Sequence, residues 1–277
     1  MDATAEERAA GASRAPGEVR VGTSGYSFKD WIGPFYPPGT KVAEQLPLYA
    51  RHFDCLEVNV TYYRVPDAQL LEGMSRRTPE GFHFILKLHG DMTHRASRDD
   101  GLYRDFNAAL RPLQDAGNLH GLLAQFPYRF KNTQANRHFV AELRERFANH
   151  PLFVEFRHAG WAIEPVFAWL RKLAIGWVSV DEPDLPGLLP REARATSDVG
   201  YVRLHGRNAE NWWEPGRGGG DRYDYLYSQE ELQEWVRKIR SLLQETRRTY
   251  VFFNNCHAGK APSNAQAMKE LLSELGL

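Results

Sequence analysis

The chain of 277 residues has little cysteine and no long apolar run. Its two cysteines, Cys55 and Cys256, each stand in an apolar stretch, far from one another in the sequence. This spacing suits neither a zinc site nor a redox pair, and it predicts two buried free thiols. No apolar run approaches the roughly 20 residues that a membrane helix needs, and the first 18 residues do not resemble a secretory signal. We therefore expect a cytoplasmic protein with no membrane partner.

The sequence also lacks net charge and the common nucleotide-binding motifs. Lys and Arg together number 35, as do Asp and Glu. This balance argues against a protein that binds nucleic acid through an extended basic surface, although a local basic groove remains compatible with it. No Gly-x-Gly-x-x-Gly follows the first predicted strand. The Gly triplet at 218–220 is not followed by Gly-Lys-Ser/Thr, so it is not a P-loop.

Strand-like and helix-like segments alternate from residue 19 onward, and 42% of the chain is hydrophobic. The predicted strands are 19–24, 55–60, 82–88, 121–126, 152–157, 175–181, 201–206 and 250–255. The predicted helices are 42–53, 68–77, 102–117, 135–150, 165–174, 229–246 and 264–275, with no clear helix after the sixth strand. Eight such units predict one α/β domain, a single (β/α)8 TIM-type barrel over 19–277 after a disordered leader, 1–18. A doubly wound open sheet is the second choice.

Polar side chains recur late in nearly every predicted strand after the first. In a (β/α)8 barrel these strand ends converge on one mouth, where active sites lie. The pattern predicts a ligand site there; the alternative is a self-neutralising ion-pair network that plugs the barrel. The residues concerned are Glu57, Asn59, Lys87, Gln125, Glu155, Arg157, Asp181, Arg203, His205, Asn254 and Asn255.

The charges at these strand ends balance, which bears on the kind of ligand. Three carboxylates (Glu57, Glu155, Asp181) face three cations (Lys87, Arg157, Arg203). A divalent metal site seldom contains competing cations, and no His-x-x-x-His spacing is present, so we expect neither a metal nor a cofactor. The cations instead favour an anionic or oxygen-rich ligand such as a phosphate, a carboxylate or a sugar.

Acid–base chemistry has two candidate proton carriers, Lys87 and His205. Neighbouring cations would lower the pKa of Lys87, while nearby carboxylates would oppose that shift, and His205 titrates near neutrality when unperturbed. Glu155 or Asp181 would be the partner carboxylate. Arg157 and Arg203 would hold ligand oxygens, and Asn254 or Asn255 would hydrogen-bond the ligand. For each residue alone, a purely structural ion pair or hydrogen bond is an equal alternative.

Two long aromatic loops are expected at the C-terminal face. The loop at 25–40 carries Tyr26, Phe28, Trp31, Phe35 and Tyr36, and the loop at 207–227 carries Trp212, Trp213 and three tyrosines. Aromatic side chains suit stacking on a sugar or a base, with the Gly triplet as a hinge; the alternative is a hydrophobic cap. The residues Tyr62, Tyr63, Arg64, His94, His158 and Trp161 follow strands on the same face.

Six motifs occur in a fixed order: VGTSGYSFKDWIGPFYP, LEVNVTYYRVP, FILKLHGDMTH, VEFRHAGW, YVRLHGR and FFNNCHAGKAPSNA. Together they resemble the YecE-like family, also called domain of unknown function 72, from about residue 19 to 275. The resemblance implies a TIM-type barrel and a site built from the same strand-end residues, with Thr93 and Gly206 in addition. The chain departs slightly from the family pattern at Tyr62 and Met92. The family's grouping with sugar isomerases rests on fold analogy, which does not identify a reaction.

Three function classes follow from these observations. The first is an enzyme (isomerase, lyase or hydrolase) acting on a small polar, anionic sugar-like or phosphorylated ligand. The second is a nucleic-acid-related enzyme or binder, because aromatic loops and arginines suit flipped bases and single strands. The third is a non-catalytic ligand-binding module. The sequence does not specify the substrate, the reaction or the oligomeric state.

Overall fold

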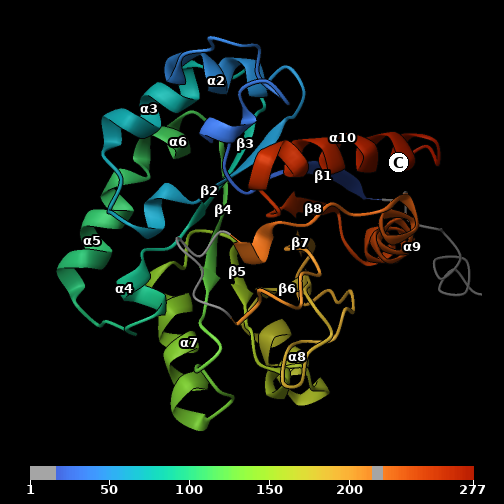
Figure 1. Ribbon diagram of the computed structural model, residues 1–277. Coiled ribbons are helices and arrows are strands. Elements are labelled where there is room, and N and C mark those ends of the chain that lie inside the picture. The colour runs from blue at the N-terminus through green and yellow to red at the C-terminus, as the bar shows by residue number, and fades with distance from the viewer. Residues whose placement is uncertain (1–16, 214–220) are drawn as a thin grey trace, which may run out of the picture.

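The computed structural model describes residues 17–213 and 221–277, which form a (β/α)8 barrel with its helices outside the strands (Figure 1). All neighbouring strands are parallel, and their order around the sheet is β1-β8-β7-β6-β5-β4-β3-β2. This order follows the chain without the reversal of a doubly wound sheet, so the predicted TIM-type barrel is confirmed. The strands are β1 (Glu18–Thr23), β2 (Cys55–Val58), β3 (His83–Lys87), β4 (Leu119–Gln125), β5 (Leu152–Glu155), β6 (Ile175–Asp181), β7 (Val199–Leu204) and β8 (Arg248–Phe253).

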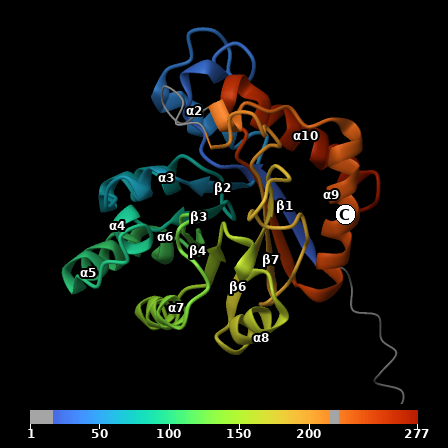
Figure 2. The same cartoon turned by 60° about the horizontal axis from the view of Figure 1, so that its bottom comes forward.

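The helices surround the barrel, as the turned view shows (Figure 2). Each buries one apolar stripe against the strands, and α9 is a clear case, with Leu232, Trp235 and Ile239 buried. The α-helices are α2 (Val42–Tyr49), α3 (Ala68–Arg76), α4 (Gly90–Thr93), α5 (Asp100–Ala109), α6 (Arg111–Asp115), α7 (Gln134–Arg146), α8 (Glu164–Lys172), α9 (Gln229–Glu245) and α10 (Lys260–Ser273). Short 3-10 turns are η1 (Lys29–Trp31), η2 (Val60–Tyr62), η3 (Ala159–Trp161), η4 (Asp221–Tyr223) and η5 (His257–Gly259).

The predicted elements match the structure with a few local differences. Residues 182–198, between β6 and β7, contain no helix, as predicted. The predicted helix 102–117 is two helices, α5 and α6, because Pro112 starts the second one. The predicted leader 1–18 lies outside the described residues except at its end, where Gly17 donates to the carbonyl of Leu243 and Glu18 begins β1. Both cysteines are free: Cys55 is buried, but Cys256 is only partly so.

The barrel closes at a seam between β1 and β2, where the strands share a single bridge, between Ser24 and Glu57. The Tyr49 hydroxyl from α2 fills the seam below that bridge. It accepts from the main-chain N–H of Thr23 at 2.9 Å and donates to the carbonyl of Cys55 at 3.0 Å. Tyr49 is fully buried, so one hydroxyl replaces a missing strand-to-strand hydrogen bond.

We expect Tyr49→Phe to destabilise the barrel by about 2–3 kcal/mol, because it leaves a buried N–H and a buried carbonyl without partners. Urea denaturation measures the change. Tyr103→Phe is the matched control, since the Tyr103 hydroxyl makes one hydrogen bond, to the carbonyl of Ser97 outside the sheet. If Tyr49→Phe and Tyr103→Phe lowered the free energy of unfolding equally, the seam would not depend on the Tyr49 hydroxyl.

Candidate active site at the mouth of the barrel

A buried arginine joins two carboxylates across the interior of the barrel. Arg203 of β7 lies with Nη2 2.7 Å from Glu57 Oε1 on β2 and with Nη1 2.5 Å from Glu155 Oε2 on β5. The arginine is 1% exposed and both glutamates are fully buried. Tyr201 adds a hydrogen bond from its hydroxyl to Glu57 Oε2 at 2.7 Å. Strand alternation places these side chains inside the barrel, as the sequence predicted.

A second arginine continues this network toward the mouth. Arg157 Nε lies 2.6 Å from Glu155 Oε1, and Arg157 Nη1 lies 3.2 Å from Glu182 Oε2. Burial alone would raise the pKa of Glu155, but Arg157 and Arg203 hold that pKa well below its ordinary range. Burial raises the pKa of Glu182 to about 7, with Arg157 only partly opposing the shift. Glu155 is therefore the fixed negative charge of the network, and Glu182 is a group that titrates near neutrality.

His205 is the neutral member of the network. Burial, with Arg157 beside it, lowers the pKa of His205 to about 3. Asn254 Nδ2 lies 2.9 Å from His205 Nδ1, and His205 Nε2 lies 3.3 Å from Glu155 Oε1. If the Asn254 amide donates to Nδ1, the imidazole proton sits on Nε2 and faces the carboxylate. Because the ring is fully buried, it orients Glu155 and has no open path to a ligand.

Lys87 differs from both arginines because its ammonium has no counter-ion within ion-pairing distance among the described residues. Its Nζ lies 4.5 Å from the centre of the Tyr62 ring, and the side chain is partly exposed at the end of β3. Burial is the main cause that lowers the pKa of Lys87 to about 7, and Arg203 adds to it while Glu155 and Glu57 oppose it. The sequence analysis named both the cations that lower this pKa and the carboxylates that oppose the shift, but not burial, which is the largest cause.

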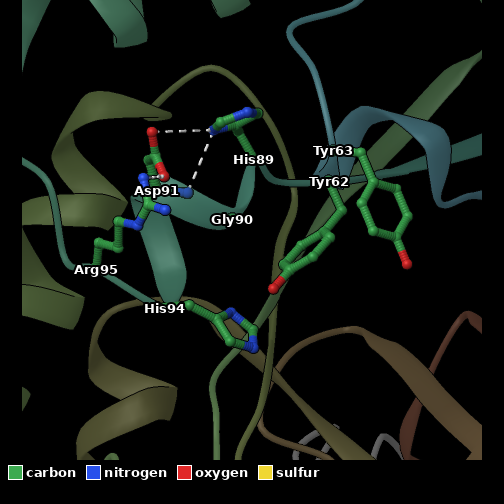
Figure 3. Close-up of a pocket in the computed structure, with 7 residues that line it drawn as sticks. All are labelled: Tyr62, Tyr63, His89, Gly90, Asp91, His94 and Arg95. Atoms are coloured by element: carbon green, nitrogen blue, oxygen red, sulfur yellow. Dashed lines mark hydrogen bonds and ion pairs between the residues drawn. The ribbon is translucent and has the colours of Figure 1, made fainter. Parts of the chain in front are cut away.

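A pocket of about 380 Å³ is lined by Tyr62, Tyr63, His89, Gly90, Asp91, His94 and Arg95 (Figure 3). Lys87 does not line it, but the Lys87 amine lies over the ring of Tyr62, which does. In this lining, the rings of Tyr62 and His94 meet edge to face with centroids 5.0 Å apart. Burial lowers the pKa of His94 to about 4, and Lys87 and Arg129 add to that effect, so the imidazole is neutral at pH 7. The pocket therefore presents a phenol and a neutral imidazole next to a free amine.

The structure does not bring Asp181 to this cluster. Its carboxylate faces the helix layer, where it accepts from Tyr227 at 2.9 Å and from Trp235 Nε1 at 2.5 Å. Arg207 completes the arrangement with Nη2 2.7 Å from Asp181 Oδ2. The next residue, Glu182, takes the inward position, because the chain continues to alternate one residue beyond the predicted strand end.

The remaining predicted ligand residues divide between the mouth and the packed interior. Asn59, Gln125 and Asn254 are half-buried at strand ends, and Asn59 Oδ1 is buried without a hydrogen-bond partner among the described residues. Arg64 is exposed just beyond β2. His158 is partly exposed and caps η3 through a hydrogen bond from the Gly160 N–H.

Two predicted ligand residues are buried in structural packing. Trp161 is fully buried against Phe156, with ring centroids 3.9 Å apart, and donates to the carbonyl of Phe130. Asn255 is also fully buried, and it donates to the carbonyl of Tyr225 and to Asn264. A ligand at the mouth would not reach either side chain without rearrangement.

The first aromatic loop is a packed cap. Trp31 and Tyr36 are buried, and Trp31 Nε1 donates to the carbonyl of Cys256 at 2.6 Å. In the second loop Trp212 is buried, whereas Trp213 is 51% exposed and contacts Tyr128. The predicted Gly hinge at 218–220 lies outside the described residues.

Comparison with known proteins places this barrel in a family. The family model described as "Protein of unknown function DUF72" matches residues 20–276. The chain belongs to the DUF72 family. It is 30% identical to the UPF0759 protein YunF of Bacillus subtilis (strain 168), over 92% of this chain and 94% of that protein.

Solved DUF72 structures have the same fold. A DUF72 family protein from Thermotoga maritima MSB8 is 40% identical, with a TM-score of 0.85 over 92% of this chain and 99% of that one. A DUF72 family protein from Enterococcus faecalis V583 is 25% identical, with a TM-score of 0.82 over 92% of this chain and 95% of that one.

Two negative findings apply to the parts of this DUF72 chain that the structure describes. Within residues 17–213 and 221–277, no three His, Cys, Asp or Glu side chains are grouped so that they could hold a metal ion. In the same ranges, the helices are too short or too polar to cross a bilayer.

Glu182 and Tyr201 are members of the network that the sequence analysis missed, and Glu182 is the charged one. The signal was present, because Glu182 follows Asp181 directly and precedes Pro183 at the end of an apolar strand. Two adjacent carboxylates at a strand end point to opposite faces, so one of them had to face the barrel.

We expect Arg203→Met to reduce the free energy of unfolding by about 3–5 kcal/mol at pH 7, because it leaves buried Glu57 without a cation and leaves Glu155 with Arg157 alone. The loss should shrink at pH 4.5, because protonation of a buried carboxylate that has lost its cation removes part of the cost. Urea denaturation at the two pH values measures both effects. Arg98→Met is the control, because the Arg98–Glu142 pair is exposed, and it should change stability little. A loss for Arg203→Met that stays constant with pH would contradict the ion-pair account.

Proposed function

We propose that the protein is an enzyme that acts on a small polar, anionic sugar-like or phosphorylated ligand at the barrel mouth, with Lys87 as the proton carrier. The observation that carries the proposal is the Lys87 amine at the end of β3, which has no ion-pair partner among the described residues and lies over the ring of Tyr62, a residue that lines the pocket. An amine with a pKa of about 7 is present in both forms at neutral pH, so it can take up and return a proton.

The surrounding groups suit an oxygen-rich ligand. Asn59, Gln125 and Asn254 offer amides at the strand ends, which can hydrogen-bond hydroxyl groups. Arg129 lies close enough to His94 to donate to its carbonyl at 2.6 Å, and its exposed guanidinium adds positive potential beside the pocket. These contacts support an anionic group on the ligand near His94.

The buried network contributes to catalysis by holding charge in place. Arg157 and Arg203 are both engaged by carboxylates, so they set the field around Lys87 and have few N–H groups left for a ligand. Glu182 is fully buried, and its pKa of about 7 makes the charge of the network change with pH near neutrality. A lysine that titrates in the same range suits the removal and return of a proton next to a carbonyl, as isomerases and lyases require.

A nucleic-acid role has one observation in its favour. Tyr63 is 78% exposed and Trp213 is 51% exposed, and large exposed aromatic side chains can stack on bases. The formal net charge is zero, which argues against the broad basic surface that would bind a nucleic-acid backbone, so this function ranks second.

The test measures melting temperature with a panel of sugar phosphates, hydroxy acids and neutral sugars. A ligand at 100 times its Kd should stabilise the wild type by about 2.7 kcal/mol, or roughly 5–10 °C for a domain of this size. Lys87→Met should abolish the shift, and Lys172→Met should retain it, because Lys172 is exposed in the last turn of α8 in the helix layer.

The outcomes separate the function classes. Chemical conversion of the stabilising ligand, followed by NMR and lost in Lys87→Met, supports the enzyme. Binding without conversion would assign a ligand-binding module instead. Stabilisation by single-stranded oligonucleotides alone would favour the nucleic-acid role, and an unchanged shift in Lys87→Met would remove Lys87 from the site.

A further inference from the structure

We propose that Lys87 is a nucleophile that forms an imine with its substrate, so that the substrate is an aldehyde or ketone that also carries an anionic group. This inference rests on the proposed function and names the substrate class of the same site. It assigns the amine a covalent role, which proton transfer alone does not require.

The geometry sets Lys87 apart from the other cations of the barrel interior. Arg203 is shared by two carboxylates, and Arg157 contacts Glu155 and Glu182. Within the described residues Lys87 Nζ has no such partner, and it lies 4.5 Å from the centre of the Tyr62 ring. A lysine whose role was to neutralise a carboxylate would lie against one, so this amine is left available to a ligand.

The protonation state of the Lys87 amine supports attack on a carbonyl carbon. An ordinary lysine with a pKa near 10.4 is neutral in only about one molecule in 2,500 at pH 7. Burial lowers the pKa of Lys87 to about 7, so roughly half of the molecules carry the nucleophilic form. Desolvation beside other cations is a known means of activating an amine for imine formation.

The pocket supplies groups that can move the protons of this reaction. The Tyr62 hydroxyl has a pKa raised by burial, so it remains a donor, and the His94 imidazole is neutral and can accept. His94 Nδ1 lies 3.1 Å from Thr93 Oγ1, which fixes the orientation of the ring. Figure 3 shows the Tyr62 hydroxyl end turned toward the His94 ring.

The step balances without an added reagent. The Lys87 nitrogen forms a bond to the carbonyl carbon, and the carbonyl oxygen takes a proton to give a carbinolamine. Loss of that oxygen as water leaves a carbon–nitrogen double bond, and nothing is oxidised or reduced. The product is a protonated imine, whose positive charge falls within the field of Glu57 and Glu155.

The anionic requirement comes from the side of the pocket next to His94. Arg129 lowers the pKa of both His94 and Tyr62, and Arg95 adds to its effect on Tyr62. Asp91, which also lines the pocket, opposes that effect on Tyr62 and is paired with Arg95 at 2.9 Å, so Arg129 leaves an excess of positive charge beside the pocket. A carboxylate or phosphate on the substrate would be drawn to this side while the carbonyl reaches Lys87.

The test traps the imine with sodium cyanoborohydride at pH 7, using glyoxylate as an anionic aldehyde and acetaldehyde as a neutral one. Peptide mass spectrometry then compares labelling rates at all eight lysines of the chain. We expect glyoxylate to label Lys87 at least about tenfold faster than Lys131, because a pKa of about 7 leaves about half of the Lys87 amines neutral at pH 7. With acetaldehyde, the ratio of the labelling rate at Lys87 to that at Lys131 should be smaller than with glyoxylate. Arg129→Met should lower this ratio for glyoxylate.

One control and two possible outcomes decide the result. Labelling in 8 M urea should make all lysines equal, which shows that the folded site causes any preference. Lys87 labelled no faster than Lys131 overturns the imine; if Lys87→Met still abolishes the ligand-induced rise in melting temperature, the proposed function stands with Lys87 as a base. Equal labelling of Lys87 by the two aldehydes overturns the anionic requirement.

Discussion

The shared contact of Arg203 with Glu57 and Glu155 is the interaction on which the rest of the barrel interior depends. It joins β7 to β2 and β5, so one side chain ties together three strands that are not neighbours. Two buried carboxylates could not remain ionised there without it. Because Arg157 also contacts Glu155, the two arginines and the two glutamates nearly cancel, and Glu182 is left close to its titration point.

This balance explains why Lys87 is chemically distinct. The carboxylates that would otherwise pair with it are already held by the arginines, and burial then makes its charged form costly. The ion-pair plug that the sequence posed as one alternative is present as a buried network. The proposed ligand site differs from it, because the Lys87 amine has no ion-pair partner among the described residues and the pocket at Tyr62 and His94 is open.

The sequence predicted the barrel and most of its inward-facing charges, because both follow from period-two alternation along apolar strands. It could not predict which partners would meet. Asp181 lies at the expected strand end, but its side chain points to the helices, and Glu182 faces inward in its place. A shift of one residue in a strand end reverses the face, and composition does not reveal it.

The loop aromatics and Trp161 show a second limit of sequence reasoning. An indole is equally suited to stacking on a sugar and to filling a core, and only tertiary packing decides between the two. Trp31 and Trp161 pack into the interior, whereas Trp213 stays exposed. For Lys87 the sequence named cations that would lower its pKa and carboxylates that would oppose the shift, but burial, which is the main cause of the low pKa, depends on tertiary packing.

The most direct test of the account is an NMR titration of the side-chain nitrogens in protein labelled with ¹⁵N-lysine. We predict that one of the eight lysine signals titrates near pH 7 and that this signal disappears in Lys87→Met. If all eight lysines instead titrate near their ordinary value of about 10.4, Lys87 is not a free, desolvated amine, and the proposed chemistry fails.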